Sequence, residues 1–412
     1  MKIGYLMQLG EDIQTPPFNG PANHVRQVVT ELECLGHQVN VLYRQGGKLW
    51  KSSGLSAFQV MEPDHGGESR PPLSERAVRR VQSALKLPYA AYFESRRFSQ
   101  VCQQELGDCD LLLERLTWMG YGGALAARSL KIPLVLEYNG DPLADLEAKG
   151  MAPRGLQLRL SSWLMRKNLS SAAHLVATGN GWRKSLIERW GVEPGRITVV
   201  ENGTGLVRLL RREDLRSFTP GPDEPGDVTL IYVGGFYPWH GIDRLLLAVA
   251  KAASSGLALK VILIGSGQGL DQAKEQAAGL GLGGQVRFMG QMQAQEYAPL
   301  LAGADIGVSP YCGWEEFSGL KIFDYKAAGL PTIASGRDGQ PDTLTHGRTG
   351  WIVPPCDEDA LYQAIVQLAA EPELRRKMGQ NARQEAEAVH GWDHTARQLE
   401  RIFYSVTGKL SA

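Results

Sequence analysis

Residues 304–335 constrain the fold most, because two strongly apolar runs flank a loop and a short helical segment in this stretch. The first run covers 304–310 and the second covers 331–335, and each has the length and composition of a buried strand. Gly329 lies where the helical segment ends, and glycine readily takes the left-handed conformation that stops a helix. Strand, helix and strand in this order predict a βαβ unit, and therefore a chain of the α/β class.

The helical segment between these strands has two faces. Leu320, Phe323 and Ala327 are spaced three and four residues apart, so we expect them to face the core. Lys321 and Asp324 are three residues apart and share a different face. Taken alone, these two residues are either a ligand-binding pair or an ion pair on a solvated helix face.

The start of the same helix is suited to an anion. Backbone N–H groups at Ser318, Gly319 and Leu320 are unpaired within the helix, and the helix dipole favours negative charge there. Gly319 has no side chain, so an anion can come close to the backbone. Lys321 adds a cation on the first turn, and Asp324 adds a carboxylate that can accept hydrogen bonds from a ribose. The segment therefore predicts a site for a nucleoside diphosphate.

Length and composition limit the remaining possibilities. A chain of 412 residues exceeds the roughly 250–300 at which a single core stops growing, so we expect two domains. A formal net charge of zero gives no basis for bulk affinity to nucleic acid. No apolar run approaches the roughly 18 residues that span a membrane, and the first predicted strand is too short for a signal peptide.

The cysteines are odd in number, scattered and without C-x-x-C spacing. This pattern predicts reduced thiols in a cytoplasmic protein rather than a disulfide framework. The five residues are Cys34, Cys102, Cys109, Cys312 and Cys356.

The N-terminal half begins with another βαβ unit. Residues 2–7 predict a strand, Gly20 lies in the loop that follows, and residues 22–35 predict a helix that leads to a strand at 39–42. Residues 45–72 are polar and rich in glycine, and they predict a long excursion without a place in the sheet.

Polar side chains follow the apolar run at 132–136, which predicts a buried strand. Glu137, Asn139 and Asp141 come at its end, and Glu114-Arg115 end the preceding strand. In an open α/β sheet, groups at the carboxyl ends of strands face the ligand. Glu137, Asn139 and Asp141 are therefore candidates for contact with a ligand, and a capped turn is the alternative interpretation.

Two predicted helical regions are basic and amphipathic. Residues 76–106 carry six arginines and lysines, and residues 161–171 combine Trp163 with Arg166 and Lys167. A basic amphipathic helix can contact anionic lipid headgroups. The same pattern also fits a solvated helix or one that packs on a core, and the sequence leaves these interpretations open.

The C-terminal half starts a new series of strands and helices. Residues 229–233 predict a strand that ends in Gly234-Gly235, and His240 precedes the next helix. His240 can donate a hydrogen bond to a phosphate oxygen, and a nearby anion would raise its pKa. A structural histidine is the alternative.

The chain resembles a known family. Glu316, seven intervening residues and Asp324, followed by Ala-Ala-Gly-Leu-Pro at 327–331, resemble the E-x7-E signature of glycosyltransferase family 4. Residues from about 228 to 356 resemble this family strongly, and residues before 200 resemble it more loosely. The resemblance implies a GT-B fold, in which two Rossmann-like, doubly wound domains face each other across a cleft. It further implies a retaining transferase that takes a nucleotide sugar as donor and needs no metal or other cofactor.

The resemblance also implies domain limits. The Glu-Asn-Gly-Thr-Gly segment at 201–205 resembles the end of the family's first domain, so we expect an N-terminal domain over 1–205. The proline-rich residues 206–227 would be the linker, and 228–389 the nucleotide-sugar-binding domain. A last helix over about 390–412 would pack back on the first domain.

The site residues implied by the resemblance fall into four groups. The diphosphate would contact Gly20, Gly234, Gly235, His240, Ser318, Gly319, Leu320 and Lys321; the ribose, Asp324; the base, Gln291 and Met292; and the transferred sugar, Glu316 and Asn139. The chain departs from the family pattern at five of these positions. It has Gly235 in place of an arginine, His240 in place of a lysine, Asn139 in place of a histidine, Asp324 in place of the second glutamate, and only Gly20 from a glycine pair.

These departures keep a second function open. A non-catalytic GT-B partner that binds sugar or a true transferase would tolerate them, whereas joint retention of Glu316, Lys321 and Asp324 favours an enzyme. An epimerase or inverting enzyme and an NAD dehydrogenase are less favoured, the last because the first strand lacks a G-x-G-x-x-G turn. We expect a saccharide or lipid-linked hydroxyl acceptor in the synthesis of cell-surface polysaccharide or glycoconjugate. The location would be the cytoplasm, with the inner face of the membrane as the alternative.

Overall fold

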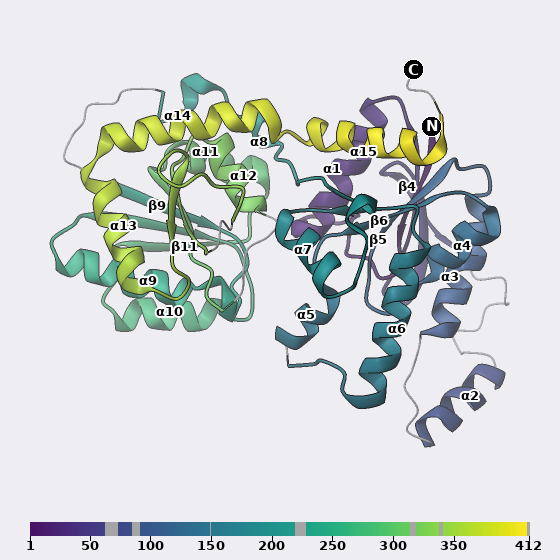
Figure 1. The fold of residues 1–412 in the computed structure, drawn as a ribbon. Coiled ribbons are helices and arrows are strands. Elements are labelled where there is room, and N and C mark those ends of the chain that lie inside the picture. The colour runs from purple at the N-terminus through teal and green to yellow at the C-terminus, as the bar shows by residue number, and fades with distance from the viewer. Residues whose placement is uncertain are drawn as a thin grey trace. The chain divides into compact units, whose positions relative to one another are not determined.

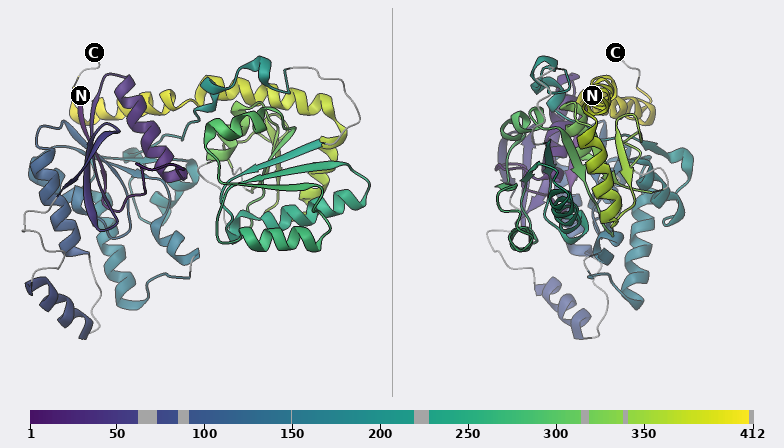
Figure 2. Two further views of the ribbon diagram at one scale, coloured as in Figure 1. Left: turned by 180° about the vertical axis from the view of Figure 1, so that it is seen from behind. Right: turned by 90° about the vertical axis from the view of Figure 1, so that its left-hand side faces the viewer.

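The computed structural model describes residues 1–61, 73–84, 91–148, 150–218, 228–313, 319–337 and 341–409. They form two compact units. Unit 1 is Met1–Glu201 with Thr395–Ala412, and unit 2 is Asn202–His394. In each unit a mostly parallel sheet lies between helices, as Figures 1 and 2 show, which confirms the predicted α/β class.

Unit 1 is built on an eight-stranded sheet in the order β4-β3-β2-β1-β5-β6-β7-β8. The pairs β2–β3 and β3–β4 are antiparallel, and all other neighbours are parallel. The strands are β1 (Lys2–Met7), β2 (Gln38–Gln45), β3 (Lys48–Ser53), β4 (Ser56–Met61), β5 (Leu111–Arg115), β6 (Leu134–Tyr138), β7 (His174–Ala177) and β8 (Ile197–Val199).

The expected excursion over 45–72 was wrong for its first part. Residues up to Met61 continue the sheet as β3 and β4, and residues 62–72 lie outside the described residues. Gly46 and Gly47 have φ values of 58° and 81° in the turn between β2 and β3. A two-residue turn with positive φ at both positions matches the right-handed twist of a hairpin, and only glycine takes that conformation without cost. The glycine pair was therefore a hairpin signal.

The helices of unit 1 are α1 (Gly20–Cys34), α2 (Leu73–Ala84), α3 (Tyr92–Glu105), α4 (Gly122–Leu130), α5 (Pro142–Ala148), α6 (Gly155–Ser171) and α7 (Asn180–Glu188). Helix α15 (Trp392–Thr407) starts in unit 2 and belongs to unit 1 from Thr395 on. Its Glu400 lies 2.9 Å from His37 Nε2.

The basic region that was predicted over 76–106 is helices α2 and α3. Glu75, which is 2% exposed, pairs with both Arg79 and Arg97, and Arg79 also pairs with Glu94. Part of the positive charge of this region is therefore neutralised within the protein.

Unit 2 has a six-stranded, fully parallel sheet in the order β11-β10-β9-β12-β13-β14. Alternate residues of the central strand β9 enter different cores. Leu230 and Tyr232 pack with α9, α10 and α13, whereas Ile231 packs with α11, α12 and α14. The period of two along a strand thus requires helices on both faces, which explains the near-continuous apolar runs in the sequence.

The strands of unit 2 are β9 (Val228–Val233), β10 (Leu259–Ile264), β11 (Val286–Gly290), β12 (Ile306–Ser309), β13 (Thr332–Ser335) and β14 (Gly350–Val353). Its helices are α8 (Leu206–Leu209), α9 (Ile242–Ser254), α10 (Leu270–Gly279), α11 (Ala294–Ala302), α12 (Leu320–Ala327), α13 (Glu358–Ala370) and α14 (Pro372–Val389). No helix in the described ranges is both long enough and apolar enough to cross a membrane.

The segment expected to be a linker, 206–227, is in part a packed element of unit 2. Leu206, Leu210 and Leu215 are buried and belong to the same apolar cluster as Leu330. The prolines and charges of the segment suggested a linker, but its leucines recur at helical and extended spacings that bury them. Residues 219–227 lie outside the described residues.

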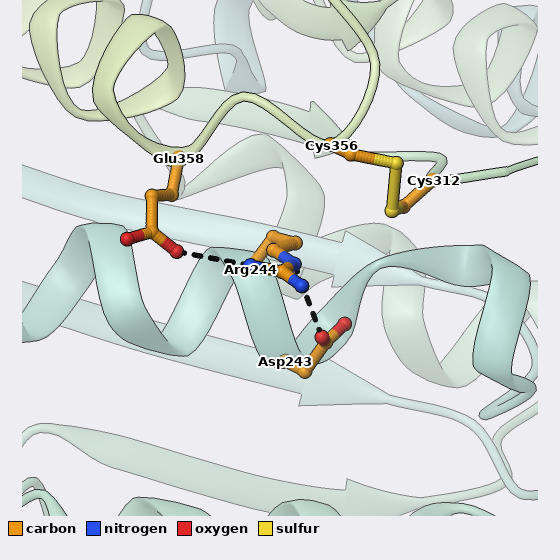
Figure 3. The surroundings of a disulfide bond; sticks show 5 residues. All are labelled: Asp243, Arg244, Cys312, Cys356 and Glu358. Carbon is orange, nitrogen blue, oxygen red and sulfur yellow. Dashed lines mark hydrogen bonds and ion pairs between the residues drawn. A yellow bond between two sulfur atoms is a disulfide. The ribbon is translucent and has the colours of Figure 1, made fainter.

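The expectation of five reduced cysteines was wrong for two of them. Cys312, after β12, and Cys356, before α13, form a disulfide (Figure 3). They are 44 residues apart in sequence, so no local spacing signals the bond. The ends of β12 and β14, which flank β13 in the sheet, bring the two loops together. Cys34, Cys102 and Cys109 are free.

A buried carboxyl group lies at the end of β5 in unit 1. Glu114 is 1% exposed, and a Cβ atom on Gly123 would lie 2.3 Å from its Oε2. The backbone of Gly123 hydrogen-bonds the carboxyl group, but Oε2 has no partner among the described residues. Burial penalises the charged form and raises the pKa of Glu114 to about 8.

Glu114 should therefore make unit 1 less stable as pH rises. Between pH 4.5 and about 8 the folded state keeps a proton that the unfolded state has released. The free energy of unfolding should fall by roughly 1.4 kcal/mol per pH unit across this window. Urea unfolding of wild type and Glu114→Gln at several pH values measures the difference, and the exposed Glu188→Gln is the control. Parallel stability profiles for wild type and Glu114→Gln would contradict the assignment.

Candidate active site

The strand order of unit 2 fixes where a ligand can be bound. In the order β11-β10-β9-β12-β13-β14, the connections from β9 and from β12 run toward opposite edges of the sheet. Ligands of open α/β sheets bind outside the carboxyl ends of the strands at such a switch point. Gly234-Gly235 follow β9 there, and Pro310-Tyr311 follow β12. Most of the described site residues of this half lie on the loops and helices that start from these two ends: Gly234, Gly235, His240, Gly319, Leu320, Lys321 and Asp324.

The two glycines after β9 make room for neighbouring side chains. A Cβ atom on Gly234 would lie 2.7 Å from Tyr232 Oη and 3.1 Å from Lys321 Cε. At Gly235 it would lie 2.7 Å from the ring of Tyr237. That ring stacks on Trp239 with 5.2 Å between centroids. The ring of Tyr237 thus occupies the space into which a side chain at position 235 would extend.

His240 is held in one orientation by the same turn. Its Nδ1 lies within hydrogen-bond distance of the Gly235 carbonyl oxygen and 2.9 Å from Tyr232 Oη. A carbonyl oxygen only accepts, so we assign the proton to Nδ1. In the neutral ring, Nε2 then has a lone pair and can accept but not donate.

His240 is not a resident cation in the ligand-free protein. Burial, and then the positive charge of Lys321, lower the pKa of His240 to about 3. The predicted rise in pKa beside an anion therefore starts from a neutral imidazole. To donate to a phosphate oxygen through Nε2, His240 would first have to take up a proton.

Lys321 places a positive charge beside this histidine. Its Nζ lies 3.2 Å from Tyr311 Oη, 4.3 Å from the centre of the Tyr311 ring and 5.8 Å from that of Tyr232. The side chain is 8% exposed, and its stem lies against Gly234. Two electron-rich ring faces stabilise a desolvated ammonium group. Neither tyrosine was predicted, because a tyrosine near a strand end is usually a core residue.

Asp324 lies one turn further along α12, and both its oxygens accept hydrogen bonds. Thr204 Oγ1 lies 2.6 Å from Oδ1, and Tyr297 Oη lies 2.7 Å from Oδ2. Burial raises the pKa of Asp324 to about 6, although these two bonds oppose the rise. Each carboxylate oxygen has a further lone pair, so the half-buried group can still accept from a hydroxyl. No local sequence pattern signals Tyr297, whereas Thr204 lies in the Glu-Asn-Gly-Thr-Gly segment noted above.

The start of α12 is described only in part. Gly319 is the residue before the helix, with φ 52°, and its Cβ would lie 3.0 Å from Thr343. A residue with a side chain would therefore be both strained and crowded there. Leu320 is the first helical residue. Glu316 and Ser318 lie outside the described residues.

The residues predicted to lie near a base follow β11. Gln291 is exposed, and its Oε1 accepts a hydrogen bond from Ser266 Oγ at 3.1 Å, so the loops after β10 and β11 are joined. Met292 packs on the apolar cluster that includes Ile264 and Leu301. Gln291 is thus an exposed polar residue at the carboxyl edge of the sheet, while Met292 is in part a core residue.

The predicted polar residues of unit 1 differ in their hydrogen-bond partners. Glu137 accepts from Tyr5 Oη at 2.6 Å, and His24 Nε2 lies 3.2 Å from it. Burial opposes ionisation, but His24 and Tyr5 hold the pKa of Glu137 below its usual value. Asp141 accepts from the backbone N–H of Leu143 at 3.0 Å, so the capped-turn interpretation holds for this residue.

Asn139 lies between these two residues in the sequence. Both polar atoms of its side chain are buried, and neither has a hydrogen-bond partner among the residues that the structure describes. Because buried amides are normally paired, Asn139 is the polar group of this strand end that a ligand would most readily satisfy. Gly20 is the first residue of α1, where Asn19 caps the helix by accepting from Ala22 N at 2.9 Å.

Acidic, histidine and cysteine side chains of the described ranges do not gather into a metal centre. No group of three or more of them is arranged to hold an ion.

Comparisons with known proteins identify the family. The family model described as "Glycosyl transferase 4-like domain" matches residues 19–203, and the model described as "Glycosyl transferases group 1" matches residues 217–385. The two matches are consecutive, and each falls mainly within one unit.

Curated relatives carry transferase names. The chain is 24% identical to the phosphatidyl-myo-inositol mannosyltransferase of Mycolicibacterium smegmatis, over 99% of this chain and 95% of that protein. It is 29% identical to the D-inositol 3-phosphate glycosyltransferase of Rhodococcus erythropolis, over 68% of this chain and 65% of that protein.

Solved structures show the same fold. A sucrose-phosphate synthase from Thermosynechococcus elongatus superposes with a TM-score of 0.72 at 19% identity, covering 99% of both chains. Anabaena Alr3699/HepE, solved with UDP and glucose, superposes with a TM-score of 0.67 at 17% identity, over 98% of this chain and 100% of that one. The chain therefore belongs to the glycosyltransferases of family 4 and has the GT-B fold.

Proposed function

We propose that this glycosyltransferase moves a sugar from a nucleoside diphosphate to a hydroxyl acceptor with retention of configuration and without a bound metal. The observation that carries the proposal is the cation of Lys321, held between Tyr232 and Tyr311 at the switch point of unit 2. Anabaena Alr3699/HepE, whose fold is similar, was solved with UDP and with UDP-glucose, which supports a nucleotide-sugar donor.

In this proposal, the main task of unit 2 is to stabilise the diphosphate as it leaves. A buried ammonium group aimed at developing negative charge acts more strongly than it would in water. Lys321 would supply this charge, together with backbone N–H groups at the start of α12. A phosphate oxygen at His240 Nε2 would favour uptake of a proton there, while Nδ1 keeps its bond to Gly235 and fixes the ring. The bond to the sugar would break with oxocarbenium character.

Asp324 would hold the ribose and not the reacting sugar. Thr204 and Tyr297 fix its carboxylate, so its remaining lone pairs have defined directions. Glu316 would contact the sugar hydroxyls, by resemblance to the family. Asn139 would contact the transferred sugar or the acceptor through its unsatisfied amide.

The acceptor would be a saccharide or a lipid-linked hydroxyl compound in the synthesis of cell-surface polysaccharide or glycoconjugate. The names of the curated relatives include phosphatidyl-inositol and inositol phosphate acceptors, so hydroxyl acceptors occur among similar proteins. A non-catalytic, sugar-binding partner is the second candidate. Gly235 and Asn139, which replace a cation and a histidine of the family pattern, favour it.

Lys321→Met should weaken nucleotide binding without unfolding the protein. Methionine keeps the apolar stem between the tyrosine rings and removes only the charge. A hydrogen bond to a charged group contributes about 1.5–3 kcal/mol, so the dissociation constant of the nucleotide should rise about 10- to 100-fold. Calorimetric titration with UDP, GDP and ADP in the presence of EDTA measures the change. Lys274→Met, on the exposed surface of α10, is the matched control.

Three results of this titration decide between the candidates. A nucleotide that binds wild type and the control, but binds Lys321→Met more weakly, supports the donor site. Equal affinity for all three proteins removes Lys321 from the site. Tight binding of a nucleotide sugar with neither transfer nor slow hydrolysis, for any acceptor of a saccharide panel, would favour the non-catalytic partner.

We further propose that helix α6 rests on an anionic phospholipid surface, so that the protein is peripheral to the membrane at its cytoplasmic side. Leu156 and Trp163 are 62% and 53% exposed. Arg159, Arg166 and Lys167 are exposed on the same face, because these positions are spaced three and four residues apart. The 17 residues of the helix include no acid. Exposed aromatic and aliphatic groups among cations are typical of an interfacial helix.

Sedimentation with vesicles tests this contact. The full chain should pellet with phosphatidylglycerol vesicles and not with phosphatidylcholine vesicles, and high salt should release it because the charges are then screened. The double change Leu156→Ser with Trp163→Ser should abolish pelleting, while Leu125→Ser on α4 should not. Absence of pelleting, or pelleting that the double change leaves intact, would refute the surface.

A further inference from the structure

The disulfide of unit 2 lies next to residues of the proposed donor site but has no part in the chemistry described so far. It joins the loop after β12 to the segment between β14 and α13, and Figure 3 shows the bond. The two sides of the bond differ in what they hold in place.

On the Cys312 side, neighbouring residues contact the side chains of the proposed diphosphate site. The preceding residue, Tyr311, contacts Lys321 Nζ through its hydroxyl group at 3.2 Å, and its ring centre lies 4.8 Å from that of His240. The N–H of Cys312 donates to the carbonyl oxygen of Trp239 at 2.9 Å.

Pro310 adds a second close approach on this side. A Cβ atom on Gly241, whose φ is 66°, would lie 1.7 Å from the Pro310 carbonyl oxygen, so the segment 310–312 lies directly on the turn that contains His240.

The Cys356 side is anchored without the bond. Asp357 caps α13 by accepting from Ala360 N at 2.8 Å. Arg244 of α9 lies 3.2 Å from Glu358 on the first turn of α13, and both are drawn in Figure 3. Residues of α13 pack in the main core of unit 2.

Cys356 itself has φ 62°, a left-handed conformation that is unfavourable for a residue with a side chain. Opening the bond would leave α13 in place, allow Cys356 to relax, and remove one tether of the segment 310–312.

We propose that the Cys312–Cys356 disulfide is a positioning element of the nucleotide-binding site, and that its reduction weakens donor binding reversibly. The inference rests on the proposed function, because Tyr311, His240 and Lys321 matter only if they hold the diphosphate. With the bond intact, Tyr311 is ordered before the donor arrives. With the bond open, binding must also order the segment 310–312, and that ordering lowers affinity.

The reaction that opens the bond needs a dithiol as reductant. A thiolate of the dithiol attacks one sulfur, the S–S bond breaks, and the other cysteine leaves as a thiolate. The second thiol of the reductant then displaces the first cysteine. The dithiol ends as a disulfide after giving up two electrons and two protons, and Cys312 and Cys356 end as two thiols. Cys356 is an exposed residue, so a small dithiol can reach the bond.

Calorimetric titration of the full chain with UDP, GDP and ADP tests the proposal, with oxidised protein compared with protein kept in dithiothreitol. Thiol counting verifies the state of the bond, because reduction should raise the number of free cysteines from three to five. The dissociation constant should rise about tenfold on reduction, as expected when one or two side chains must be ordered on binding. The double change Cys312→Ser with Cys356→Ser should reproduce the weak state and no longer respond to dithiothreitol.

Cys34→Ser is the control, since Cys34 is an exposed free cysteine of unit 1. It should bind nucleotide as wild type does and keep the response to reduction. Circular dichroism of the reduced protein supplies a separate readout. Weaker binding with an unchanged spectrum supports a positioning role, whereas loss of helical signal from the chain on reduction would overturn that role and make the bond a purely structural one.

The two proposals fail in different ways. Equal nucleotide affinity of oxidised and reduced protein, with the bond shown to be open, overturns the inference about the disulfide alone. Absence of binding for every nucleotide in the oxidised state overturns the proposed donor site, and the inference with it.

Discussion

The parallel pairing of β9 with β12 is the constraint on which the rest of unit 2 depends. These strands are neighbours in the sheet but are not consecutive in the chain. Because they are parallel, the loops that follow them lie at the same edge of the sheet, although the loops are far apart in sequence. Gly234 comes to this edge from one strand and Tyr311 from the other. Lys321 then enters between them from the helix that follows β12. The cation of the proposed donor site is therefore placed by sheet topology rather than by any continuous motif.

The proposed donor site has little positive charge before a ligand binds. Lys321 is positive, while His240 is neutral because burial and Lys321 itself lower its pKa. A family member with both an arginine and a lysine would hold two charges ready for the diphosphate. In the proposed site, the second charge would form only when a bound phosphate oxygen raises the pKa of His240. Such a site would be less repulsive when it is empty, and it would couple donor binding to proton uptake.

Sequence reasoning succeeded where one period or one residue type determines the outcome. The apolar spacing of Leu320, Phe323 and Ala327 predicted one buried face of α12, because a helix repeats every 3.6 residues. Phe323 and Ala327 are buried, but Leu320 is only half-buried, and the helix also buries Ile322 and Tyr325 outside that face. It failed where contacts depend on distant segments. Tyr297 of α11 donates a hydrogen bond to Asp324 of α12. Cys312 after β12 forms a disulfide with Cys356 after β14, and β13 lies between these two strands. Neither pair is close in sequence, so only the folded sheet determines them. The hairpin at Gly46-Gly47 was different, since its signal was local and was overlooked.

The stacked ring of Tyr237 has a consequence for how this sequence can change. A Cβ atom at position 235 would lie 2.7 Å from this ring, so an arginine there would require the ring to move. Because Tyr237 is 42% exposed, the ring can move toward solvent, and the cost is the loss of its stacking on Trp239. A side chain at 235 and the aromatic stack therefore compete for the same space, and the residue at 237 affects which residues position 235 tolerates.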